Sequence, residues 1–173
     1  MTKFRWFLAA AGTALAGLIA VLGVSSSASA DPSTILKFTT LAPVTGPYVG
    51  AASPIRTVPG GGLPWMITTA TGSLARDGHL LVHVRGLVLA DRSPVPPAQQ
   101  GTNPIPGFKA IVSCQTIDSG GAASITNIST AQFPASTSGN ADIKAKVSLP
   151  HPCIAPVVFV TSPAGAWFAA TGS

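Results

Sequence analysis

The sequence predicts an all-β protein, a two-layer antiparallel β-sandwich of immunoglobulin-like topology with seven to eight strands and one disulfide. Composition is the first reason: 46% of the 173 residues are hydrophobic, only 9% are charged, and Glu is absent. So few charges exclude a disordered chain, and the lack of Glu excludes a helical bundle, whose exposed faces use that residue. The second reason is a series of β-branched runs separated by turn residues after Pro64. No segment after residue 30 has the 3.6-residue period of a helix.

Residues 1–30 are predicted to be a secretory signal peptide that is cleaved. Lys3 and Arg5 precede the uncharged run Leu8–Val24, and Ala28-Ser29-Ala30 supplies the small-x-small cleavage pattern. The alternative is a retained membrane anchor, but as a helix this run spans only about 25 Å, less than the ~30 Å of a bilayer core. We therefore expect bacterial-type export of a protein that is secreted and extracellular, or associated with the cell envelope.

Residues 31–64 form a Pro- and Gly-rich N-terminal segment, and residues 65–173 are assigned to the β-sandwich domain. The segment holds six prolines and the run Gly60-Gly61-Gly62. Each proline removes a backbone donor and fixes φ, so a central strand or a helix is not expected there. Only Ile35–Thr39 has the composition of a short edge strand.

Seven strands are expected after residue 64. The dipeptide Asp77-Gly78 between the first two is a strong hairpin signal. In Ala141–Leu149, apolar residues alternate with Asp, Lys and Ser, as in an antiparallel strand with one buried face. Seven or eight such strands favour an immunoglobulin-like sandwich over a barrel, with another two-sheet sandwich as the alternative. The expected strands are Trp65–Leu74, His79–Leu89, Phe108–Thr116, Ser124–Gln132, Ala141–Leu149, Ile154–Thr161 and Ala166–Ala170.

The chain has two cysteines, Cys114 and Cys153, and both lie in the part expected to be exported. Two cysteines in an oxidising compartment most often pair, and no Cys-x-x-Cys motif indicates a redox or metal site instead. The sequence therefore predicts a Cys114–Cys153 disulfide that ties the third strand to the sixth. The chain-entropy model gives such a bridge about 4 kcal/mol of stabilisation.

The basic residues are scattered along the part of the chain that follows residue 30. Only Lys144 and Lys146 are close enough in sequence to share a strand face. A protein that binds nucleic acid needs a clustered patch to neutralise several phosphates, so nucleic acid is not an expected partner. The basic residues are Lys37, Arg56, Arg76, Arg85, Arg92, Lys109, Lys144 and Lys146.

No catalytic residue, metal site or cofactor is predicted. His79 and His83 are four residues apart, but along a strand that separation is roughly 13 Å, too far for one metal ion to bridge. The sequence has no Gly-x-Ser-x-Gly motif, and without Glu a glycosidase-type carboxylate pair is poorly supplied. We therefore do not expect an enzyme. The alternative is a small extracellular hydrolase or metal-dependent enzyme that uses His151 with Asp or His residues gathered by the fold.

The connection from Ala90 to Gly107 is a candidate partner-binding loop. Hairpin loops usually have about two to five residues, and loops as long as this one are often functional. Its prolines, including Pro94, Pro96 and Pro97, would make it stiff and lower the entropy lost on docking. The alternative is an inert insertion.

Trp167 is the second candidate for partner binding. Trp167 and Phe168 are adjacent in the last expected strand, and adjacent strand residues face opposite ways. One of the two should therefore point outward, where a Trp could stack on a sugar or anchor an interface. The alternative is that the N-terminal segment covers it.

Together these features predict a secreted β-sandwich that acts as an extracellular binding module or a cell-envelope component. Its expected partner is an extracellular protein or glycan, and the chain is expected to be a monomer without a membrane span after signal cleavage. Besides the hydrolase, a further alternative is a secreted inhibitor or effector that would bind its partner through the stiff loop.

Overall fold

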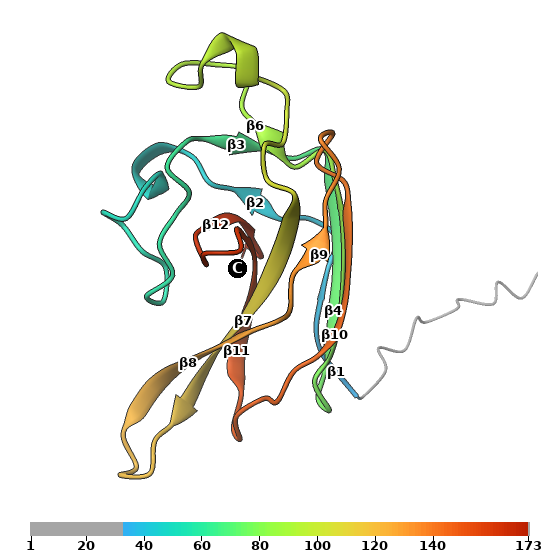
Figure 1. The fold of residues 1–173 in the computed structure, drawn as a ribbon. Coiled ribbons are helices and arrows are strands. Elements are labelled where there is room, and N and C mark those ends of the chain that lie inside the picture. The colour runs from blue at the N-terminus through green and yellow to red at the C-terminus, as the bar shows by residue number, and fades with distance from the viewer. Residues whose placement is uncertain (1–32, 173) are drawn as a thin grey trace, which may run out of the picture.

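A computed structural model describes residues 33–172, so the predicted signal peptide lies outside the described residues. The protein is all-β, as the sequence predicts, and its two large sheets are antiparallel (Figure 1). No helix within residues 33–172 has the length and apolar character needed to cross a membrane. The four-stranded sheet has the order β1 (Thr34–Phe38), β4 (Thr69–Ala75), β5 (His79–Arg85) and β10 (Ala141–Lys146).

The six-stranded sheet is built mainly from the second half of the chain. β9 (Phe133–Pro134) pairs with β7 beside the main path of this sheet. A separate two-stranded ladder joins β3 (Trp65–Met66) to β6 (Val88–Leu89). Two short 3-10 helices, η1 (Gly46–Tyr48) and η2 (Pro97–Gln99), lie in connections. The main path runs β2 (Ala42–Pro43), β12 (Trp167–Ala170), β11 (Ile154–Thr161), β7 (Gly107–Ile117) and β8 (Ala123–Ser129).

The first two expected strands are each interrupted, and the prediction of two continuous strands is wrong. β4 and β5 form the expected hairpin, whereas β3 and β6 leave the four-stranded sheet and pair with each other. Gly86 explains the break after β5, because its φ of +67° turns the chain out of the extended conformation. A Cβ at Gly86 would lie 2.2 Å from the Thr68 hydroxyl oxygen, so the two segments approach closely at this point.

The two sheets share one hydrophobic core. On β5 the side chains of Leu80, Val82 and Val84 are fully buried, and the residues between them face away from the core. From the other sheet, Phe168 stacks on Trp65 with ring centroids 3.9 Å apart. On β5 the period of two residues therefore places one face in the core, as expected for a half-buried antiparallel strand, whereas all four residues of β12 are buried.

The Pro- and Gly-rich segment is part of this packing. β1 forms one edge of the four-stranded sheet and β2 one edge of the six-stranded sheet. Beyond β2 the chain packs on the six-stranded sheet, where Gly61 N–H donates to the Trp167 carbonyl oxygen and Trp167 N–H donates to the Pro59 carbonyl oxygen, both at 2.9 Å. A Cβ at Gly60 would lie 1.8 Å from the Tyr48 carbonyl oxygen, so only glycine fits there.

The predicted disulfide is confirmed. Cys114 lies on β7, and Cys153 directly precedes β11, so the bond joins neighbouring strands of the six-stranded sheet. The two Cα atoms are 4.9 Å apart, within the range usual for disulfides. No free cysteine is found among the described residues.

Candidate functional site

The exposed face of the four-stranded sheet carries a concentration of basic side chains, which we name the basic face. Because the alternate residues of β5 are buried, Arg85 and two histidines of that strand point outward. The same alternation exposes Lys144 and Lys146 on β10, and Lys37 is exposed on β1. The basic face consists of Lys37, His79, His83, Arg85, Lys144 and Lys146.

The strand register aligns these residues in rows across the sheet. Lys37 pairs with Ser73, Ser73 with Leu81, and Leu81 with Lys144. One row therefore crosses all four strands with a lysine at each end and no acidic residue between them. Three strand spacings place the two lysine Cα atoms roughly 14 Å apart.

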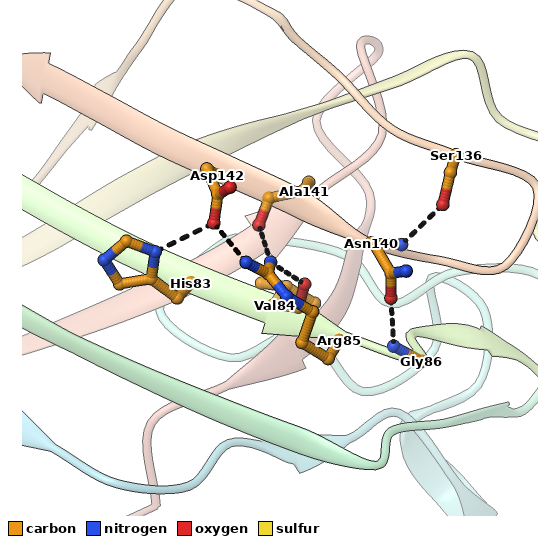
Figure 2. A network of polar contacts seen from close by, with 8 residues as sticks. All are labelled: His83, Val84, Arg85, Gly86, Ser136, Asn140, Ala141 and Asp142. Atoms are coloured by element: carbon orange, nitrogen blue, oxygen red, sulfur yellow. Dashed lines mark hydrogen bonds and ion pairs between the residues drawn. The ribbon is translucent and has the colours of Figure 1, made fainter.

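Asp142 is the acidic residue inside this face, and Figure 2 shows its contacts. Its Oδ1 atom accepts a hydrogen bond from His83 Nδ1 at 2.8 Å and one from Arg85 Nη2 at 2.9 Å. Arg85 Nη1 also donates to the carbonyl oxygens of Val84 at 2.8 Å and Ala141 at 3.1 Å. The hydrogen bond from His83, followed by that from Arg85, lowers the pKa of the Asp142 carboxyl.

A second acid–histidine pair lies at the hairpin end of the face. The Asp77 Oδ2 atom is 2.6 Å from His79 Nδ1, and Asp77 Oδ1 accepts a bond from the His79 backbone N–H at 3.2 Å. The backbone bond is the larger cause of a lowered Asp77 pKa, and the side-chain bond adds to it. A hollow of about 530 Å³ beside this pair is lined by Arg76, Lys146 and His151, among others.

The charges on the basic face are unbalanced. Among residues 33–172, Lys37, Lys144 and Lys146 make no ion pair, whereas Arg85 shares Asp142 with His83. The basic residues are scattered along the sequence, but strand pairing brings four of the eight onto one face of the sheet. The sequence already contained the outward positions of β10, but finding the face required the pairing of β10 with β5 and of β1 with β4.

The candidate binding loop projects from the body between β6 and β7 (Figure 1). Pro94, Pro96 and Pro97 are exposed on it. The loop is nevertheless anchored, because the side chain of Val95 is buried in the core and Asn103 Nδ2 donates to two backbone carbonyl oxygens at 2.8 Å. The three prolines are thus held on an ordered loop.

Trp167 lies away from that loop and is not exposed. It is 3% exposed, and its neighbour Phe168 is buried on the opposite side of the same strand. The Tyr48 ring from the N-terminal segment lies 6.3 Å from the Trp167 ring, and Phe159 lies 6.1 Å away. Of the two readings that the sequence left open, the structure agrees with burial, because the N-terminal segment covers Trp167 and leaves it no exposed face for a partner.

The histidines that the sequence analysis considered do not form a metal cluster. His79 and His83 contact different aspartates, and His151 lines the hollow at the hairpin end. Within residues 33–172 no group of three or more His, Cys, Asp or Glu side chains is placed to hold a metal ion.

Comparison with known protein families, curated proteins and solved structures finds no match for this chain. What the basic face can bind therefore follows from its own shape and charge. It lies on the exposed face of a sheet, and its lysines are point charges on long flexible stems, which suit an extended anionic ligand better than a small molecule in a pocket.

Proposed function

We propose that this protein is an extracellular binding module that holds an acidic polysaccharide on its basic face. The observation that carries the proposal is the row that begins at Lys37 and ends at Lys144 without an intervening carboxylate. Lys146 extends the positive charge along β10. A polymer with regularly spaced negative groups can contact both ends of such a row at once, which a compact anion cannot do.

The residues in and beside the row of lysines fit a sugar chain. Ser73 and Thr71 place hydroxyl groups on this face, and these can donate to and accept from sugar hydroxyls. Leu81 is 42% exposed in the middle of the row and offers an apolar contact to the C–H face of a sugar ring. Electrostatic attraction supplies encounter rate and orientation, while these groups add contacts specific to sugars.

Export through the predicted signal peptide is part of the proposal. The disulfide supports it, because such bonds persist in oxidising compartments and are rare in the cytosol. A place outside the cell, free or at the envelope, also puts the basic face where acidic polysaccharides occur.

An immunoglobulin-like sandwich is also proposed for the fold, in a variant form. The order β12-β11-β7-β8 has the succession of strands G, F, C and C′ in a variable-type domain. Two features depart from that type: β4 and β5 form a hairpin within one sheet, and the disulfide joins neighbouring strands instead of the two sheets.

The function is tested by binding of the purified, oxidised protein to immobilised alginate and dextran sulfate, with neutral dextran as the control polymer. We expect both acidic polymers to bind, and raising the salt concentration to weaken binding. A plot of log affinity against log salt concentration has a negative slope, and the double variant Lys144→Gln/Lys146→Gln should reduce the size of that slope by roughly two. Arg92→Gln removes an exposed charge from the projecting loop and should change nothing.

Three results would contradict the proposal. These are equal binding to neutral dextran, an equal loss in Arg92→Gln, and tighter binding to double-stranded DNA than to either acidic polysaccharide. The last result would make nucleic acid the preferred polyanion.

A further inference from the structure

A groove of about 790 Å³ lies between the N-terminal segment and the β11–β12 part of the six-stranded sheet. Its walls are mostly apolar and include Leu36, Pro43, Ile55, Val157 and Trp167. The groove shares only β1 with the four-stranded sheet, so it is a place distinct from the basic face. Its volume is within the range of small-molecule sites, about 300 to 1,000 Å³.

Among the described residues, Arg56 is the one charged side chain that lines this groove. Its Nη1 atom donates to the Ser113 carbonyl oxygen at 3.1 Å, which holds the guanidinium against β7, an interior strand of the six-stranded sheet. Within residues 33–172 no carboxylate forms an ion pair with it. A guanidinium has five N–H donors, so most of them are left for another acceptor.

The backbone around Arg56 is held in an unfavourable conformation. Arg56, Thr57 and Ala155 are the non-glycine residues with positive φ in the described chain, at +48°, +68° and +45°. Arg56 and Ala155 both line the groove, and Thr57 is adjacent. Asn127 Nδ2 fixes this conformation by donating to the Arg56 carbonyl oxygen at 2.9 Å and to the Thr57 hydroxyl at 3.0 Å. Arg56 and Thr57 are the two central residues of a tight turn closed by backbone hydrogen bonds between Ile55 and Val58, and such a turn requires positive φ. Placing non-glycine residues in this conformation costs energy, as is often seen at ligand sites.

Unpartnered buried polar atoms occur at the same place. Among residues 33–172 they are the Trp167 Nε1 and the Ser113 Oγ, which have no hydrogen-bond partner. Trp167 lines the groove, and Ser113 is the residue whose carbonyl oxygen holds Arg56. Buried polar groups are normally satisfied, so their concentration here indicates packing that is not optimised for stability alone.

From these observations we propose that the groove binds a small amphipathic carboxylate, with the carboxylate on Arg56 and the apolar body against Ile55, Val157 and Trp167. The single cation in an apolar groove matches a ligand with one negative charge and an apolar body. Guanidinium and carboxylate can form two parallel charge-assisted hydrogen bonds, which fix the orientation of the ligand. The groove chemistry is the same for an apolar chain and an apolar ring, and the test includes one of each.

Calorimetric titration of the purified, oxidised full chain tests the proposal with decanoate as a chain, 2-naphthoate as a ring and decanol as the uncharged control. We expect at least one carboxylate to bind, and decanol to bind about tenfold more weakly than decanoate if the chain is the preferred body. Arg56→Gln keeps a donor for the Ser113 carbonyl oxygen and should weaken the bound carboxylate about tenfold. Ala42→Phe, at an exposed position that lines the groove, should weaken chain and ring alike.

Matched controls separate this site from the basic face. Arg92→Gln and Lys144→Gln/Lys146→Gln remove cations elsewhere and should leave carboxylate affinity unchanged. The proposal is overturned if neither carboxylate binds the folded protein, if Arg56→Gln binds as tightly as the wild type, or if Arg92→Gln weakens binding equally. Near-UV circular dichroism checks that each variant is folded. If Arg56→Gln does not fold, Ala42→Phe still tests whether the carboxylate binds in the groove.

Discussion

His83 and Asp142 are 59 residues apart in the chain, yet the His83 Nδ1 atom lies 2.8 Å from the Asp142 Oδ1 atom. The two residues face each other across the β5–β10 pair, and Arg85 donates to the same carboxylate oxygen at 2.9 Å. An ionised carboxylate only accepts hydrogen bonds, so the bonded His83 Nδ1 carries a proton. Asp142 therefore forms an ion pair with Arg85. Among the described residues, the lysines of the basic face form no ion pair.

The first prediction concerns the titration of Asp142. Its pKa lies below the ordinary value of 3.8 because His83 and Arg85 stabilise the ionised form. Each partner contributes a hydrogen bond and a favourable charge, so His83→Ala and Arg85→Ala should each raise the Asp142 pKa. Carbon-13 NMR of the side-chain carboxyl groups measures both. Asp77 is the internal control, because its partner is His79 and its titration should not respond to either substitution.

The same pKa shift sets the direction of a stability change with pH. A carboxyl whose pKa is lower in the folded than in the unfolded chain stabilises the fold above pH 3.8, and that stabilisation is lost as the pH falls through the folded-state pKa. The difference in free energy of unfolding between wild type and Asp142→Asn should therefore shrink below pH 3.8. Urea unfolding at several pH values measures it, and a difference that grows on acidification would contradict the assignment.

The second prediction tests the orientation of β5 with two adjacent leucines. Leu80 is fully buried between the sheets, whereas Leu81 is 42% exposed on the basic face. Leu80→Ala should lower the free energy of unfolding by about 2 to 5 kcal/mol, because it removes buried methyl groups and leaves a cavity. Leu81→Ala should cost less than about 1 kcal/mol. Similar losses in both variants would mean that this strand is buried on both faces.

The orientation of these strands was predictable because a period of two residues is a local property of sequence. The alternation from Ala141 to Lys146 and the turn at Asp77-Gly78 both correspond to structure. The break at Gly86 was not predictable, since it depends on the approach of Thr68 from another segment. The composition of the N-terminal segment also did not predict that it packs onto a sheet, because its prolines exclude central strands but do not prevent such packing.

The candidate sites depend on contacts between distant residues, and for this reason the sequence did not reveal them. The basic face exists because β10 pairs with β5 and β1 pairs with β4, and no local pattern specifies those partners. The groove is formed by separate segments that include Arg56 and Ala155. The outward direction of Trp167 followed from strand alternation, but its burial depended on Tyr48, more than a hundred residues earlier in the chain.

The third prediction compares two turn glycines that the sequence cannot distinguish. Gly78 and Gly165 both have positive φ, at +89° and +95°. A Cβ at Gly78 would lie 1.9 Å from the Val147 carbonyl oxygen, whereas a Cβ at Gly165 would meet nothing within 4 Å. Gly165→Ala should therefore cost about 1 kcal/mol from backbone strain alone. Gly78→Ala should cost clearly more, and equal thermal shifts for the two variants would contradict the close approach at Gly78.

The fourth prediction concerns the disulfide. Cys114 and Cys153 are separated by 39 residues, and closing a loop of this length stabilises the fold by about 4 kcal/mol in the chain-entropy model. The double variant Cys114→Ala/Cys153→Ala should lose roughly that amount in urea unfolding. Reduction of the wild type with dithiothreitol is the matched control and should give a similar loss. If neither treatment lowers the free energy of unfolding by more than about 1 kcal/mol, the bond does not constrain the unfolded chain as the model requires.

The last prediction uses two hydroxyl groups whose removal should have opposite effects. The Ser113 Oγ is buried and has no partner among the described residues, so Ser113→Ala removes a desolvated polar group and should be neutral or stabilising by up to about 1 kcal/mol. The Thr130 Oγ1 accepts from the Ala110 N–H at 3.0 Å and donates to the Ala131 carbonyl oxygen at 2.7 Å. Thr130→Val keeps the shape but breaks both bonds, and should cost about 1 to 3 kcal/mol.

Urea unfolding of the two variants gives the comparison directly, because each substitution changes only a hydroxyl group. If Ser113→Ala destabilises the protein as much as Thr130→Val does, then the Ser113 hydroxyl has a partner in solution. An ordered water beneath the Arg56 segment would be such a partner, and the buried Ser113 hydroxyl group would then be hydrogen-bonded. A neutral or stabilising Ser113→Ala variant would instead show that the chain keeps an unpartnered hydroxyl beside Arg56 at a cost in stability.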